Sequence, residues 1–310
     1  MAALVSRGAQ VGVSFAYLVL GAQLVWVGLD MGARFAPLLG AAPQGYVGDK
    51  VGVEVLALVY RDCGAASLLL GAALLLMGDS KLGLSLALVQ LAAWAGALGR
   101  DQAELARLGA TDRHMRALDN MLPALVAALL LCALGVVFSA SKNDAKLLRS
   151  KSFLAKLILT ASCLSEVPLA LFELVDGPRA VAAVPGFSMA PFTAVGATAL
   201  RMALTWRGSL VLSLCVLLSV IKPTRAGTFL AALLHGSHVA NNAFGRERLV
   251  AASAAANAGV ARAMADMLDA AALFHVVATG LLVLATVLGA APPAPAAGSS
   301  AGSSSKKKQN

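Results

Sequence analysis

Three ionisable residues lie inside a stretch that is apolar enough to cross a membrane. Residues 53–77 carry Glu54 near one end and the adjacent pair Arg61 and Asp62 well inside. A charge placed in hydrocarbon costs at least about 2.5–3.5 kcal/mol, so each group needs a counter-charge or a water-filled cavity. Glu54 and Arg61 are seven residues apart, about two helical turns, and therefore share one face of a helix. This pattern predicts either ion pairs between helices or a polar pocket that binds a ligand.

A second group of ionisable residues lies in later apolar stretches. Glu166 and Glu173 are again seven residues apart on one predicted helix, and Arg201 and Arg207 follow on the next. Carboxylates and guanidinium groups on neighbouring helices would neutralise one another inside the bilayer. Two hypotheses follow. The arginines either join helices as structural ion pairs, or they line a cavity that binds a lipid headgroup, a quinone, a sterol or an ion.

Two histidines and an asparagine share one face of a further predicted helix, at His235, His238 and Asn241. They are interpreted first as hydrogen-bonded core residues. The second interpretation is a proton-handling site shared with the two glutamates, because imidazole and a buried carboxylate can both titrate near neutral pH. The third is metal or haem ligation by two of His235, His238 and His275. A catalytic zinc site usually has three protein ligands at a recognisable spacing, so the sequence predicts no metal and no cofactor.

The composition excludes a soluble globular domain. Hydrophobic residues make up 59% of the 310-residue chain and charged residues only 13%, and the mean hydropathy is +0.78. The formal charge of +9 comes from basic residues scattered between apolar runs and gathered in the C-terminal tail. No basic face with interleaved aromatic residues occurs, which excludes a nucleic-acid-binding class. The four cysteines fall in apolar stretches, with no disulfide framework and no CxxC spacing.

The apolar runs predict an all-α polytopic membrane protein with about eight transmembrane helices. The predicted spans are 11–31, 53–77, 82–99, 121–140, 153–175, 195–221, 228–244 and 267–290. The first is interpreted as a retained span, because it is long for a signal peptide and no convincing cleavage site follows it. Two polar helix-forming stretches, 100–120 and 245–266, are interpreted as extensions of the fourth and eighth helices.

The second half of the chain repeats the first at a constant offset. Tyr60-Arg61 corresponds to Trp206-Arg207, 146 positions later, and the same offset places Arg116 on Arg262. Because each unit has an even number of spans, both would enter the membrane from the same side, as parallel repeats. We therefore expect two four-helix repeats, 1–140 and 153–290, with a polar linker at 141–152 and a disordered tail at 291–310.

Basic residues predict the orientation in the membrane. A cluster of lysines and arginines follows the fourth span, so the positive-inside rule places both termini in the cytosol. The tail ends with Lys307 and Lys308 three and four places from the terminus. This spacing resembles the dilysine retrieval signal of endoplasmic-reticulum membrane proteins, which implies that membrane and contact with coat proteins. The alternatives are a basic tail with no address, and a plastid or mitochondrial membrane.

Short motifs in the first half resemble the DoxX-like group of four-helix membrane proteins. The motifs are Tyr60-Arg61-x-x-Gly64 and Leu98-Gly99-Arg100, and the likeness covers about 54–140. The second half departs from it, with Gly208 in place of Asp62 and Leu210 in place of Gly64. Since the functions of that group are poorly defined, the resemblance implies a fold rather than an activity.

A thinner resemblance links the second half to emopamil-binding-type sterol isomerases and their non-catalytic relatives. The shared residue types are intramembrane Glu, Trp, His and Asn, here Glu166, Glu173, Trp206, His235 and Asn241. Their spacing does not reproduce the pattern of that family, so no catalytic role is carried over.

Together these features predict a non-enzymatic multi-pass protein that binds or moves a small amphiphilic molecule in a polar intramembrane pocket. Its partners would be membrane lipids and a small hydrophobic ligand, and no nucleic acid. The predicted ligand-binding residues are Glu54, Arg61, Asp62, Arg201, Arg207 and Asn241. The alternatives are a membrane isomerase or redox enzyme and a structural subunit of a membrane complex. The enzyme would use His235, His238, Glu166 and Glu173.

Overall fold

The computed structural model describes residues 1–29, 50–110, 112–139, 152–182, 192–220, 225–254 and 258–288. These residues form eight α-helices and no β-strand. The helices are α1 (Ala2–Leu29), α2 (Lys50–Met77), α3 (Lys81–Arg107), α4 (Asp112–Phe138), α6 (Phe153–Ala182), α7 (Ala194–Val220), α8 (Arg225–Ala254) and α9 (Ala258–Leu288). The predicted tail, most of the predicted linker, and the retrieval lysines Lys307 and Lys308 lie outside the described residues.

Seven of these eight helices are long and apolar enough to cross a membrane. The prediction of an all-α polytopic membrane fold is therefore confirmed. The eighth, α8, is long enough but falls short in hydropathy. It contains His235, His238 and Asn241 in its middle and the charged run Arg246-Glu247-Arg248 further on. The two histidines and the asparagine belong to the site described below.

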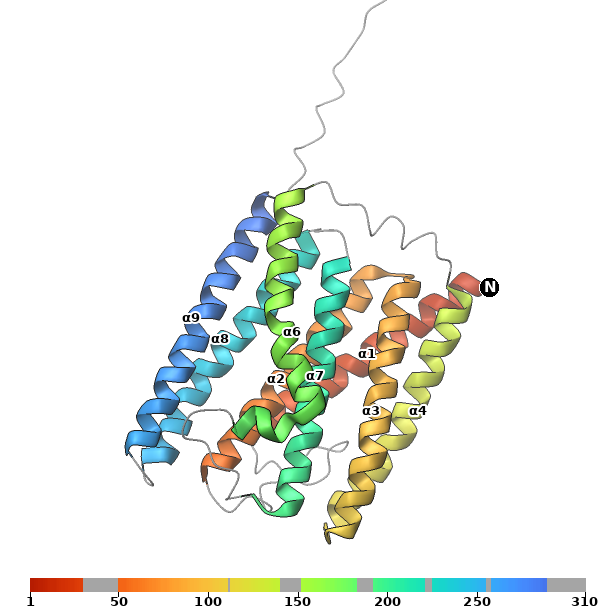
Figure 1. Ribbon diagram of the computed structural model, residues 1–310. Coiled ribbons are helices and arrows are strands. Elements are labelled where there is room, and N and C mark those ends of the chain that lie inside the picture. The colour runs from red at the N-terminus through yellow and green to blue at the C-terminus, as the bar shows by residue number, and fades with distance from the viewer. Residues whose placement is uncertain are drawn as a thin grey trace, which may run out of the picture.

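Two helices form the centre of the bundle and the others surround them (Figure 1). The most apolar windows of α2 and α7 are 72% and 78% buried, whereas that of α9 is 11% buried. α2 and α7 pack against each other, α1 packs along α2, and α6 packs along α7. The beginning of α1 and the end of α9 lie at the same end of the bundle (Figure 1).

The two halves of the chain interlock instead of forming separate bundles. The hairpin of α3 and α4 joins the centre mainly through contacts of α3 with α7, and hardly touches α2. In the same way, α8 contacts α2 far more extensively than α7. Each half therefore completes its core with a helix from the other half. Any site at the centre is consequently built from both.

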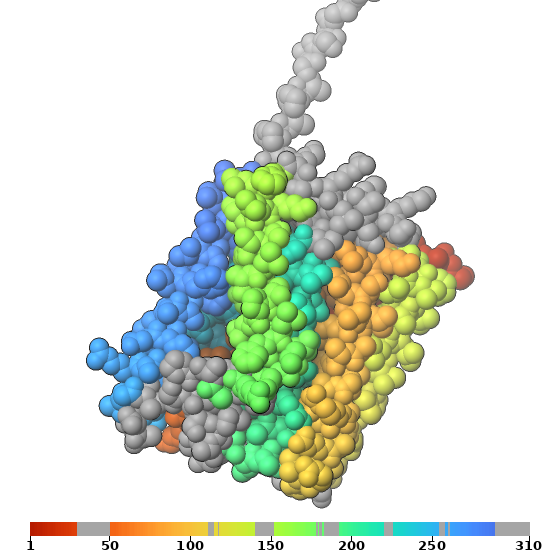
Figure 2. Space-filling view, in the orientation of Figure 1, coloured from red at the N-terminus to blue at the C-terminus, as the bar shows by residue number. Residues whose placement is uncertain are grey.

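The exterior of the bundle is apolar and the interior holds charges, the reverse of a soluble protein. The outer helices expose large side chains that would face lipid, among them Leu130, Leu134, Leu171, Val277 and Leu284. Figure 2 shows α9, α6, α3 and α4 along this face, with only part of α7 visible between α6 and α3. Charged residues are buried between the helices instead, namely Arg61, Asp62, Asp101, Glu166, Glu173 and Arg207. This distribution is the one expected when hydrocarbon is the solvent.

The polar stretches 100–120 and 245–266 form corners between helices. α3 continues to Arg107, the chain turns at Gly109, and α4 begins at Asp112. Gly109 has φ of +77°, a conformation that favours glycine. The second part of each stretch extends the following helix, α4 or α9, as predicted, but the first part does not. In each corner the first part belongs to the preceding helix, because polar residues near the membrane surface do not end a helix.

Glycines allow α1 and α2 to cross closely. A Cβ atom on Gly64 would lie 2.6 Å from the backbone nitrogen of Val25 and 2.7 Å from the carbonyl oxygen of Gly21. Backbones therefore touch at this point, as at other membrane helix crossings built on small residues. Gly64 belongs to the Arg-x-x-Gly motif, so the spacing in that motif places Arg61 one turn from the crossing.

We expect Gly64→Ala to weaken the α1–α2 crossing, because the added methyl group meets backbone rather than a flexible side chain. Overpacking of this kind costs about 1–3 kcal/mol. The matched control is Gly96→Ala on α3, where a Cβ atom meets nothing within 4 Å. Denaturant titration in detergent micelles measures both free energies of unfolding. Equal stability of the two variants would contradict the close crossing.

Candidate functional site

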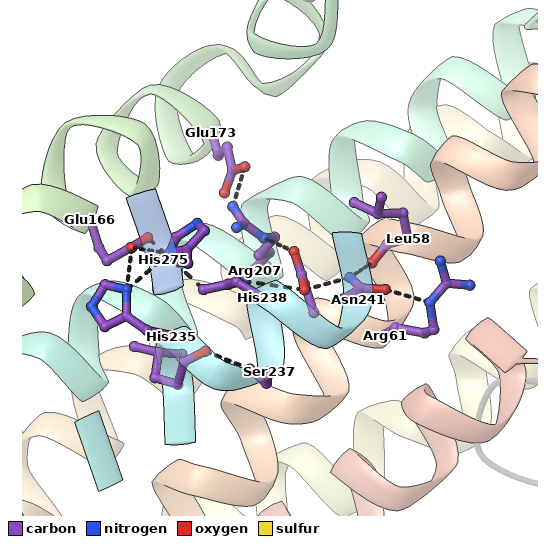
Figure 3. Close-up of polar contacts among 12 residues, drawn as sticks. Leu58, Arg61, Glu166, Glu173, Arg207, His235, Ser237, His238, Asn241 and His275 are labelled. Carbon is purple, nitrogen blue, oxygen red and sulfur yellow. Dashed lines mark hydrogen bonds and ion pairs between the residues drawn. The ribbon is translucent and has the colours of Figure 1, made fainter. Parts of the chain in front are cut away.

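A continuous network of buried polar side chains runs through the centre of the bundle (Figure 3). It draws on α2, α6, α7, α8 and α9 and so combines both halves of the chain. Its charged and imidazole members, all but His275 less than 9% exposed, are Arg61, Asp62, Glu166, Glu173, Arg207, His235, His238 and His275. The network has three parts, which are an ion-pair centre around Arg207, an arginine end around Arg61 and a histidine end around Glu166.

The ion-pair centre consists of one guanidinium group and two carboxylates. Arg207 Nε lies 3.1 Å from Asp62 Oδ2, and Arg207 Nη1 lies 2.5 Å from Glu173 Oε1. Asp62 is on α2 while Arg207 is on α7, so the first pair joins the two halves directly. With a carboxylate on each side, the charge of Arg207 is fully compensated.

Asp62 and Asn241 connect the centre to both ends of the network. Asn241 Nδ2 donates to Asp62 Oδ1 at 2.5 Å and to the carbonyl oxygen of Leu58 at 3.0 Å. His238 Nδ1 lies 3.3 Å from the same Asp62 oxygen. On its other side, Asn241 Oδ1 accepts a hydrogen bond from Arg61 Nε at 2.5 Å. Asn241 is therefore a neutral side chain that connects Arg61 to Asp62, and through Asp62 to Arg207.

Arg61, at the arginine end, has only neutral partners. Its Nη1 donates to the carbonyl oxygen of Gly28 at 2.7 Å, and its guanidinium carbon lies 5.0 Å from the centre of the Phe244 ring. Nη2 is buried and has no hydrogen-bond partner in the part of the chain that the structure describes. Among the residues that the structure describes, no carboxylate lies within ion-pair distance of Arg61. Glu54, on the same helix, is 3.7 Å from Arg248 instead.

The histidine end gathers donor atoms from three helices. Glu166 Oε1 on α6 lies 3.4 Å from His235 Nδ1 on α8 and 3.6 Å from His275 Nδ1 on α9. The two Nδ1 atoms are 2.9 Å apart. Ser162 Oγ lies 2.6 Å from the other ring nitrogen of His235. His238 Nε2, which is buried without a hydrogen-bond partner, is 4.0 Å from Glu166 Oε2.

The structure brings together most of the residues singled out in the sequence. The arginine end and the centre contain Arg61, Asp62, Arg207 and Asn241 from the predicted ligand-binding set. The four residues of the alternative catalytic set, Glu166, Glu173, His235 and His238, all join the same network.

Two predicted site residues lie outside the buried network. Two other residues make polar contacts with predicted site residues, although the sequence indicated no role for them. Glu54 contacts Arg248, and Arg201 pairs with Asp101 at 2.7 Å and with Glu104, between α7 and α3. Ser162 carried no pattern in the sequence that would have identified it. Asp101 is wholly buried, although it lies in a polar stretch that indicates exposure.

A separate apolar pocket of about 240 Å³ lies between α1, α3 and α4. Its lining includes Tyr17, Leu91, Trp94 and Met121, and contains none of the predicted site residues. Such a surface suits a hydrocarbon chain or ring rather than a polar group.

Arg207→Met should destabilise the protein strongly, because it leaves Asp62 and Glu173 as unpaired buried charges. Breaking a buried ion pair in this way costs about 3–5 kcal/mol. Adding Glu173→Gln should recover part of the loss by removing one of those charges. Arg248→Met is the control and should cost under about 1 kcal/mol, because Arg248 is 45% exposed. Free energies of unfolding in micelles test this, and equal losses for Arg207→Met and Arg248→Met would contradict it.

Comparison of the chain with protein-family models, with curated proteins and with solved structures gives no match. The resemblance to DoxX-like proteins therefore stays a prediction from short motifs, and no activity is carried over from a relative. The function has to be inferred from the geometry of the buried network.

Proposed function

We propose that this chain is a multi-pass membrane protein that binds a small amphiphilic molecule with an acidic headgroup, anchored by Arg61. One observation carries the proposal: Arg61 is a buried cation without a carboxylate partner among the described residues, and its Nη2 group donates no hydrogen bond. A buried charge without a partner is unfavourable in a bilayer and marks a functional site.

The two buried arginines differ in what they can still bind. Arg207 already has two carboxylates, so it serves as a structural ion pair between the halves. Arg61 uses Nε and Nη1 on neutral oxygens, which leaves its net charge uncompensated. A carboxylate or phosphate group would supply both the counter-charge and an acceptor for Nη2.

The surroundings of Arg61 favour a ligand that is apolar over most of its length. Phe244 covers one side of the guanidinium, and Leu58 lies on the same helix one turn away. The backbone of Gly245 packs closely against the guanidinium, since an added Cβ would lie 3.2 Å from Nη2. The outer helices expose hydrocarbon side chains, so a molecule approaching through them meets an apolar surface.

The proposal includes a duplicated origin for the two halves. An offset of 146 positions carries the starts of α2, α3 and α4 to within two residues of those of α7, α8 and α9. The interlocked contacts support it, because α3 on α7 and α8 on α2 are the equivalent pairs expected around a two-fold axis between α2 and α7. A parallel repeat is in turn consistent with both termini on one side of the membrane.

The cellular setting is proposed from the sequence alone. The basic residues support an orientation with both termini in the cytosol, and Lys307 and Lys308 support retention in the endoplasmic reticulum. Replacing both lysines by serine should redistribute a fluorescently tagged protein to later compartments. An unchanged distribution would contradict the retrieval signal.

Native mass spectrometry with lipid extraction tests ligand binding directly. We expect wild-type protein to retain an acidic amphiphile, Arg61→Ala to lose at least about nine-tenths of it, and Arg61→Lys to keep part, because lysine preserves the charge without the guanidinium geometry. The matched control is Arg248→Ala, which removes a guanidinium 5.1 Å from the same Phe244 ring but one that already has Glu54 nearby.

Two results would contradict the proposal. One is a folded Arg61→Ala protein that keeps the same molecule at wild-type occupancy. The other is wild-type protein, purified gently from its own membrane, that retains no acidic amphiphile. In the second case a structural subunit of a larger complex becomes the better account.

A further inference from the structure

We propose that Glu166, His235 and His275 bind a divalent transition-metal ion, for which Zn²⁺ is the best match, with His238 as the fourth ligand. The site lies at the histidine end of the network and does not depend on a ligand at Arg61. The donor atoms come from α6, α8 and α9, which pack against one another and hold them in place.

The spacing of the donor atoms matches one face of a zinc tetrahedron. Glu166 Oε1, His235 Nδ1 and His275 Nδ1 form a triangle with sides of 2.9, 3.4 and 3.6 Å. Zinc bonds of about 2.0–2.1 Å to nitrogen and oxygen, arranged tetrahedrally, place neighbouring ligand atoms about 3.3 Å apart. The three atoms are thus already near the positions that one ion would require.

A metal accounts for these three contacts better than a proton does. Each of the three atoms can present a lone pair toward the others. A single proton can form a hydrogen bond between only one pair of these three atoms, which leaves the other two pairs without a bond. One cation at the centre of the triangle contacts all three atoms.

Hydrogen bonds around the triangle orient the histidines for ligation. Ser162 Oγ, 2.6 Å from His235 Nε2, can accept its proton and so leave the lone pair on Nδ1. Asp62 does the same for His238, since Oδ1 is 3.3 Å from Nδ1 and the free lone pair is then on Nε2. Metal-binding histidines are almost always fixed by such an acceptor on the second ring nitrogen.

His238 provides an independent indication of a ligand. Its side chain is 3% exposed, and its Nε2 has no hydrogen-bond partner among the residues that the structure describes. That atom lies 4.0 Å from Glu166 Oε2, on the carboxylate that already belongs to the triangle. A buried imidazole nitrogen without a bond is costly unless something binds it. A metal at the triangle would provide that partner once the ring turned toward it.

The charge balance also favours a divalent cation. The network holds three carboxylates, on Asp62, Glu166 and Glu173, against two guanidinium groups, on Arg61 and Arg207, so with neutral imidazoles the carboxylates are in excess. Among the described residues, Glu166 has only histidines within ion-pair distance. An ion such as Zn²⁺ would supply a positive charge beside that carboxylate inside a low-dielectric interior. The nitrogen and oxygen donors, without thiolate, also suit Co²⁺, Ni²⁺ and Cu²⁺.

Metal titration of the purified full-length protein tests the site. After treatment with a chelator, we expect the detergent-solubilised protein to bind one Zn²⁺ per chain, measured by elemental mass spectrometry. Co²⁺ in the same site should give the intense visible absorption of four-coordinate cobalt rather than the weak absorption of the hydrated ion.

Single substitutions identify the ligands. Glu166→Gln and His275→Ala should each weaken Zn²⁺ binding by at least about 10-fold, a loss in the range found for altered metal sites. His238→Ala should change the cobalt spectrum as well as the affinity. The control is His114→Ala, because His114 is the remaining histidine of the chain and lies in the first turn of α4. It should leave both measurements unchanged.

X-ray absorption at the zinc edge identifies the ligand atoms in the wild-type protein, so this test does not depend on whether the variants fold. We expect a shell of four nitrogen and oxygen atoms with the outer scattering of imidazole rings. Wild-type protein that binds no stoichiometric metal would overturn the proposal. So would bound zinc without imidazole scattering, or undiminished binding in a folded His235→Ala/His275→Ala protein.

Discussion

The ion pair between Asp62 and Arg207 joins the two halves of the chain at the centre of the bundle. Neither charge is tolerable alone in hydrocarbon, so the pair is a condition for packing α2 against α7. Asp62 also contacts His238 and Asn241, which makes this one carboxylate a partner of three residues from the second half. The docking of α8 on α2 therefore involves the same carboxylate, through its other oxygen.

The two ends of the network differ in chemistry. At one end, Arg61 is a cation without an ion-pair partner among the described residues. At the other, the Glu166 carboxylate and the imidazole nitrogens of His235 and His275 converge. At the centre, by contrast, Arg207 pairs directly with the carboxylates of Asp62 and Glu173. The charges at the centre of the network therefore hold the helices together, whereas we propose that those at the arginine and histidine ends bind ligands. A ligand at either end would also alter the electrostatic environment of the other.

The sequence anticipated the type of fold well and the partners of the charged residues only partly. Apolar length and period predicted the helices, and the predicted spans lie within or close to the observed helices. The seven-residue spacing of Glu54 and Arg61 placed them correctly on one helix, but Arg248, from a distant helix, is nearer to Glu54. Spacing along a helix says which residues share a face, not which helix that face meets.

The sequence by itself determined that this is an all-helical membrane protein with ionisable residues in its interior, because hydropathy and charge placement are local properties of the chain. Only the tertiary structure decided that α8 packs on α2, since the order of helices around a bundle depends on contacts between distant segments. That choice brings Asn241 to Arg61 and His238 to Asp62. It also unites His275 with Glu166, a pairing that no spacing in the sequence expresses, because the two residues come from different helices.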